Sequence, residues 1–143
     1  MDPLTALGLT ANILQFVNFS MQLFHGAQEI YFSGDTAEDK SLEVVTSEMK
    51  RFSSTLSSSA GSPQTDDEKG LCRLAEECKI LSEQILQLLE KIKPKDPKSK
   101  SQSFRSALKT KFYGKEKREL ESRLDKCRSQ LALQFQCLMR FLL

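Results

Sequence analysis

An uncharged run of 22 residues, from Pro3 to Phe24, stands near the start of this chain and restricts its fold. As an α-helix the run is long enough to cross a bilayer. Polar and small side chains recur within it and just beyond it at steps of three and four residues, so they share one stripe of the helix. The stripe consists of Thr5, Gly8, Asn12, Gln15, Asn18, Gln22, Gly26 and Glu29.

Apolar side chains fill the rest of this helix, over more than half of its circumference. A helix this apolar is either the central member of a bundle or one that enters lipid on demand. The apolar side chains are Leu7, Leu9, Ile13, Leu14, Phe16, Val17, Met21, Phe24, Ala27 and Tyr31.

Two glycines, Gly8 and Gly26, interrupt the expected first helix. A glycine inside a helix costs about 1 kcal/mol relative to alanine. The two residues either let another helix approach closely or are simply tolerated.

The composition of the whole chain is that of an ordinary soluble protein. Its 143 residues, 39% hydrophobic and 28% charged, suffice for a single domain with its own core. Asp2 and Pro3 stand where a secretory signal would carry Lys or Arg, so we expect a cytoplasmic protein. The apolar ending LMRFLL leads us to expect that residues 1–143 are the N-terminal domain of a larger protein.

Helical periodicity extends through most of the sequence. The first helix is predicted from about Leu4 to Tyr31, with Asp2 as its cap and Ser33 to Asp35 after its end. The second is predicted to begin near Asp39 and to end in the serine-rich run 57–59. Its apolar residues alternate steps of three and four: Leu42, Val45, Met49, Phe52 and Leu56.

The third helix has the strongest signal in the chain. Thr65 and Glu68 form a capping-box pattern at its start, and Pro94 cannot continue a helix at its end. Between them an apolar seven-residue repeat is unbroken. It consists of Leu71, Leu74, Cys78, Leu81, Ile85, Leu88 and Ile92.

The C-terminal part is predicted to hold a short basic helix, Ser101 to Phe112, and a last long helix from about Lys115. No segment alternates polar and apolar residues, so we expect no sheet. The fold class is therefore all-α: a helical bundle of four long amphipathic helices plus one short helix, with the first packed among the others. The inner face of the last helix is assigned to Leu120, Leu124, Cys127, Leu131, Phe135, Leu138 and Phe141.

Positive charge is concentrated in one part of the chain. Between Glu90 and Arg118 eleven Lys or Arg stand against three Asp or Glu, a local charge of +8 in a chain whose total is +2. Such a surface suits anionic lipid, an acidic partner or nucleic acid. The first interpretation of this stretch is a solvated loop and helix face, and contact with anionic lipid is the second. Nucleic acid is the third, because no reading helix or RNA-binding signature is present. The candidate anionic-lipid contacts are Lys91, Lys93, Lys95, Lys98, Lys100, Arg105, Lys109 and Lys111.

The sequence offers no catalytic or metal-binding pattern. His25 is the only histidine, and no carboxylate or serine is placed by the sequence to relay a proton to it. No phosphate-binding loop is present, which disfavours nucleotide binding. We therefore expect no enzyme and no cofactor and, with a single histidine, no metal. The four cysteines have spacings that suit no zinc motif and are expected to be buried free thiols: Cys72, Cys78, Cys127 and Cys137.

A resemblance to a known family covers essentially the whole chain in order. It is carried by MDPLTALGLTANILQFVNFSMQLFHGAQEIYFSG, VVTSEMKRFSSTLSS, DDEKGLCRLAEECKILSEQILQLLEKIK, SFRSALKTKF and ELESRLDKCRSQLALQFQCLMRFL. These segments resemble the HeLo-like N-terminal domains of fungal NOD-like receptors of the STAND class. In those receptors a NACHT or related NTPase and repeat domains follow.

The resemblance implies an effector of programmed cell death and heterokaryon incompatibility that acts as a homo-oligomer. Its N-terminal helix would stay in the bundle until oligomerisation and then move to the plasma membrane. Carried over to this sequence, the membrane-insertion and oligomerisation residues are Leu4, Leu7, Gly8, Leu9, Ile13, Leu14, Phe16, Val17, Met21 and Phe24. Two alternatives stay open: a helical interaction module without membrane activity, and a nucleic-acid adaptor using the basic region.

Overall fold

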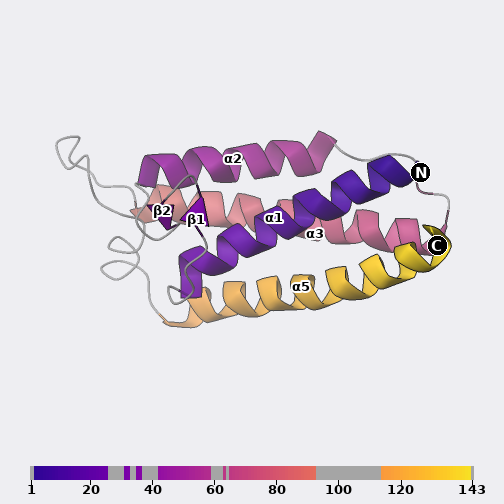
Figure 1. Cartoon of the computed structure of the whole chain (residues 1–143). Helices are drawn as coiled ribbons and strands as arrows, with labels where there is room; N and C mark the ends of the chain where they lie inside the picture. Colours follow the sequence, from indigo (N-terminus) through magenta and orange to yellow (C-terminus); the bar gives the residue numbers. More distant parts are fainter. Residues whose placement is uncertain are drawn as a thin grey trace.

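The computed structural model describes residues 2–25, 31–32, 35–36, 42–58, 63, 65–92 and 114–142. Four long helices lie side by side, and each runs antiparallel to the next along the chain (Figure 1). They are α1 (Pro3–His25), α2 (Leu42–Ser58), α3 (Asp66–Ile92) and α5 (Gly114–Leu142). The prediction of an all-α helical bundle with four long helices is confirmed. The predicted short helix, Ser101 to Phe112, lies outside the described residues.

Helix α1 packs against all three other helices, and α3 does the same. The first helix therefore lies among the others, as predicted, and crosses in front of α3 between α2 and α5 in Figure 1. Helices α2 and α5 pack mainly against this central pair. The N-terminal end of α1 and the C-terminal end of α5 lie at the same end of the bundle.

The start of α1 follows the predicted cap. The backbone N–H of Leu4 donates to Oδ1 of Asp2 at 3.2 Å, and the N–H of Ala6 donates to the Asp2 carbonyl at 3.0 Å. Pro3 takes the first helical position, where its missing N–H costs nothing.

The predicted end of the first helix is wrong. Helix α1 is described as far as His25, and Tyr31 lies in a β-strand instead of a helix. Strands β1 (Tyr31–Phe32) and β2 (Asp35–Thr36) form a two-residue antiparallel ladder that pairs Tyr31 with Thr36. Aromatic residues favour strands. This ladder is the one departure from the expectation of no sheet in the described chain, and it leaves the fold class unchanged.

Helices α2 and α3 bury the residues that their periodicity marks. The five periodic apolar residues of α2 are all buried. In α3 the Glu68 backbone N–H donates to Oγ1 of Thr65 at 3.1 Å, which confirms the predicted N-terminal cap. The Ile92 side chain lies outside the described set. The other six members of the predicted repeat are all buried: Leu71, Leu74, Cys78, Leu81, Ile85 and Leu88.

Helix α5 is buried along only part of its predicted inner face. Leu120, Leu124, Cys127 and Leu131 belong to the core, but Phe135 is 41% exposed. The prediction is therefore wrong for Phe135, because the buried line of α5 ends at Leu131 and none of the described side chains after it is buried. The side chains of Leu138 and Phe141 lie outside the described set.

Candidate functional site

The two long sides of α1 differ sharply in their surroundings. One side forms much of the bundle core, and its largest members, Phe16 and Phe19, are fully buried. The other side faces solvent although it is largely apolar. The core side consists of Ala6, Leu9, Ile13, Phe16, Val17, Phe19, Leu23 and Phe24.

The solvent-facing side carries a row of apolar residues that we call the outer stripe: Leu4, Leu7, Ala11 and Leu14. Leu4 is 76% exposed, Leu7 38% and Leu14 43%, and Ala11 is exposed as well. Their steps of three, four and three residues place them on one line of the helix. The same steps form the contact line of a coiled coil, so the outer stripe has the pattern of a helix-pairing surface. No helix of the described bundle covers it.

The ten residues predicted for membrane insertion and oligomerisation divide between the two sides. Leu4, Leu7, Gly8 and Leu14 are exposed, and Met21 is half-buried. The other five are core residues: Leu9, Ile13, Phe16, Val17 and Phe24. A lone folded molecule can therefore offer only the first group to a membrane or to a second copy.

The predicted polar stripe faces solvent only in part. Gly8 and Gln15 are exposed, Thr5, Asn12 and Asn18 are half-exposed, and Gln22 is buried. The reason is that α1 has neighbours on three sides, so even its polar positions meet other helices. The stripe residues Gly26 and Glu29 lie outside the described residues.

Two buried polar side chains of α1 lack hydrogen-bond partners within the described chain. They are the Ser20 hydroxyl and both amide atoms of Gln22. Thr10, by contrast, donates to the Ala6 carbonyl at 2.8 Å. A buried polar group without a partner costs about 1–3 kcal/mol. The C-terminal half of α1 is therefore held less firmly in the bundle than its apolar burial alone would give.

Gly8 does not serve a close helix contact inside the bundle. A Cβ atom built on it meets no atom within 4 Å. Gly70 in α3 differs, because its Cβ position is only 2.5 Å from Nε2 of Gln134 in α5. The sequence left open whether Gly8 lets another helix approach closely. Such a close contact between helices is found at Gly70 instead.

Gly8→Ala is expected to raise the free energy of unfolding by about 0.5–1 kcal/mol, because alanine has the higher helix propensity and its methyl group meets open space. Urea unfolding measures the change. Gly70→Ala is the control, and its gain should be smaller because the Gln134 side chain must move away. A destabilised Gly8→Ala protein would show that the α1 backbone at this position is in close contact after all.

The basic surface is described only at its edge. Lys91, at the end of α3, is exposed. The other candidate lipid contacts lie outside the described residues: Lys93, Lys95, Lys98, Lys100, Arg105, Lys109 and Lys111. Among the residues that the structure describes, no group of three or more His, Cys, Asp or Glu side chains is placed to hold a metal ion.

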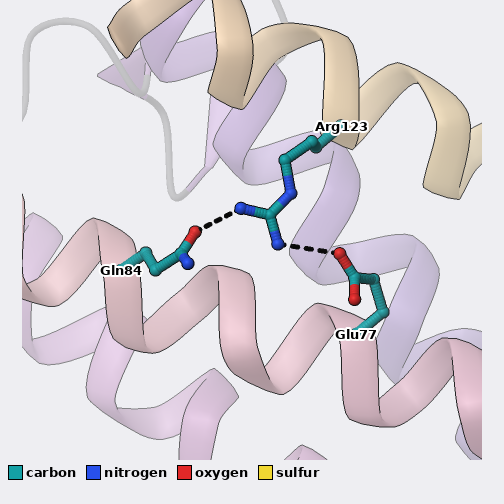
Figure 2. A network of polar contacts seen from close by, with 3 residues as sticks. All are labelled: Glu77, Gln84 and Arg123. Carbon is teal, nitrogen blue, oxygen red and sulfur yellow. Dashed lines mark hydrogen bonds and ion pairs between the residues drawn. The ribbon is translucent and has the colours of Figure 1, made fainter.

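The groove between α3 and α5 was not predicted. Arg123 of α5 bridges it, donating to Oε1 of Glu77 at 2.8 Å and to Oε1 of Gln84 at 2.5 Å (Figure 2). Hollows of about 460 Å³ and 240 Å³ lie on either side of this bridge. Glu77 and Gln84 are seven residues apart on one face of α3, but nothing in the sequence says that α5 lies opposite that face.

Cys127 contributes to the wall of the larger hollow, and its thiol hydrogen-bonds with that of Cys78. This bond and burial raise the pKa of Cys78 far above its usual range. The same bond lowers the pKa of Cys127, because the Cys78 thiol donates to it. All four cysteines are free; Cys78 and Cys127 are buried, as predicted, whereas Cys72 and Cys137 are half-buried.

By length and composition α1 would suffice to cross a membrane, over the 22 residues Pro3–Phe24. The core helix of a soluble protein can satisfy the same criterion. Comparison of the chain with protein-family models, with curated proteins and with solved structures found no match.

Proposed function

We propose that this domain is a non-enzymatic signalling and cell-death effector that acts by oligomerisation and by membrane targeting through α1. The observation that carries the proposal is the double character of α1. It has no charge from Pro3 to Phe24, and it leaves the apolar outer stripe exposed while its other side forms the core. We propose that the chain is the HeLo-like domain of a fungal NOD-like receptor. An NTPase and repeat domains would follow it in that parent protein.

The proposed mechanism is a shift in population between two positions of α1. In the lone molecule the core side of α1 is covered by α2, α3 and α5. Clustering of several molecules on an anionic membrane brings their outer stripes together. The lipid then provides an apolar environment for the core side of a released α1. A ligand or surface can shift such an equilibrium only by binding one of the two states more tightly. The unpartnered Ser20 and Gln22 reduce the cost of leaving the bundle.

The position of the polar side chains fits entry from one end. Ser20 and Gln22 lie close to the C-terminal limit of the uncharged run, so an inserted α1 would hold them near the headgroups. The first two turns, with Leu4 and Leu7, are the part that reaches hydrocarbon. Exposed basic residues such as Lys91 add attraction to an anionic leaflet.

The test is leakage of dye from vesicles of phosphatidylcholine and phosphatidylserine on which the protein is clustered. Wild-type protein should release the dye, and Leu14→Asp should abolish the release, because a carboxylate in the outer stripe opposes both helix pairing and lipid contact. Ile80→Asp is the matched control: Ile80 is 38% exposed but lies on α3. Leakage equal in wild type and Leu14→Asp, or no leakage by clustered wild type, would contradict the membrane part of the proposal.

The outer stripe also supports a second candidate, a helical interaction module that never enters lipid. The steps of three and four residues in the outer stripe suit pairing with another helix. In that case light scattering shows oligomers that grow with concentration and are lost in Leu14→Asp, whereas the protein does not float with vesicles. Flotation separates the two candidates, since only the first binds lipid.

A further inference from the structure

Two buried thiols meet where α3 and α5 pack against each other. Cys78 of α3 is fully buried and Cys127 of α5 is 2% exposed. The register of the two helices is fixed on either side of them. Arg123, one turn before Cys127, bonds to Glu77, the neighbour of Cys78, and Gln134 covers Gly70 further along. The two thiols interact directly, and the titration of each depends on the other; we call them the thiol pair.

A small molecule can approach the thiol pair through the larger hollow. Cys127 forms part of its wall, and the volume of about 460 Å³ far exceeds that of a peroxide. The hollow is also lined by three cationic side chains, Arg73, Arg123 and Lys126, against one carboxylate, Glu77. The hydrogen bond with Cys78 is the largest influence on the pKa of Cys127 and lowers it, and Arg123 acts in the same direction, whereas burial and Glu77 raise it. The thiolate is the form of cysteine that attacks an oxidant.

We propose that Cys78 and Cys127 form a reversible oxidation site at which a hydroperoxide produces a disulfide between α3 and α5. The Cys127 thiolate attacks a peroxide oxygen, the O–O bond breaks, and the departing oxide takes up a proton, which leaves a sulfenic acid on Cys127. The Cys78 sulfur then attacks the Cys127 sulfur, the S–S bond forms, and the hydroxyl leaves as water with the Cys78 proton. The peroxide gains two electrons and the two thiols lose them; a dithiol reverses the change.

The disulfide would join the two helices that both pack against α1. It would close a long loop, because 48 residues separate Cys78 from Cys127. A cross-link over such a loop stabilises the folded state chiefly by restricting the unfolded chain. The oxidised protein should therefore melt about 5–15 °C above the reduced one. This inference does not depend on the proposed function.

The test uses the folded full chain and stoichiometric hydrogen peroxide. The intact mass should fall by two hydrogen atoms, peptide mapping should place the bond between Cys78 and Cys127, and dithiothreitol should restore the mass. The double variant Cys72→Ser, Cys137→Ser should react in the same way. In Cys78→Ser the reaction should stop at a Cys127 sulfenic acid, which dimedone traps, whereas Cys127→Ser should trap nothing at Cys78.

Three results would overturn the inference. One is a double variant that keeps its mass in peroxide. Another is a bond in the wild type that includes Cys72 or Cys137 instead of joining the thiol pair. The third is a bond that forms only after urea has unfolded the protein, which would show that Cys78 and Cys127 are ordinary core residues.

Discussion

Replacement of Phe16 by alanine is expected to lower the free energy of unfolding by about 3–5 kcal/mol. Phe16 is fully buried, and its ring meets Phe52 of α2 edge-on at a centroid distance of 5.9 Å. Phe19 meets the same ring at 5.6 Å, so Phe52 packs against two aromatic residues of α1. A domain of this size has a total stability of about 5–15 kcal/mol. The loss is therefore a large part of the total, and urea unfolding should show it as a lower midpoint.

Leu14→Ala is the control for this prediction and should change the free energy of unfolding by no more than about 0.5 kcal/mol, as exposed positions usually do. Leu14 is 43% exposed on the opposite side of α1. Equal losses in the two variants would mean that α1 does not hold its described orientation in solution. The comparison also decides which residue can test function. A charge at Phe16 removes the fold and with it every activity, whereas Leu14→Asp tests the outer stripe in a folded protein.

The sequence alone could not separate Phe16 from Leu14, because both belong to the apolar arc of a helix that is apolar over most of its circumference. Periodicity predicts burial well when charged and polar side chains fill the rest of the helix. Helix α3 shows this: its seven-residue repeat identifies the side chains that the structure buries. In α1 the contrast between faces is weak. The buried side is then set by where α2, α3 and α5 lie, so Gln22 is buried and Leu4 is exposed.

Contacts between helices could not be predicted from the sequence, for a related reason. The cap at Thr65 is local, and residues three apart in the chain were enough to predict it. The Arg123 bridge and the thiol pair join residues 39 to 49 positions apart, and their formation depends on α3 and α5 being neighbours in antiparallel register. Periodicity placed Cys78 and Cys127 on inner faces but could not say that these faces meet.

The amide hydrogens of α1 are expected to exchange as slowly as those of α3 in the lone protein. Release of α1 would expose seven large apolar core side chains, and each contributes about 1.5–3 kcal/mol. The total of about 10–20 kcal/mol is comparable with the stability of the whole domain. Even at the lower value fewer than about one molecule in 10⁷ would have α1 released, since every 1.4 kcal/mol is a factor of ten. Exchange of α1 should therefore need unfolding of the whole bundle.

Clustering on anionic vesicles should change this pattern if α1 moves to the membrane. An inserted helix keeps its own hydrogen bonds, so the informative amides are those of the helices that it leaves. Helices α3 and α5 would lose the side chains that cover their core faces, and their exchange should accelerate by several orders of magnitude while α1 stays protected. Leu14→Asp should retain the slow exchange of the lone protein in all four helices. Identical protection of every helix in lone and clustered wild type, measured while the vesicles leak, would mean that leakage arises without release of α1 and that the outer stripe acts on the intact bundle.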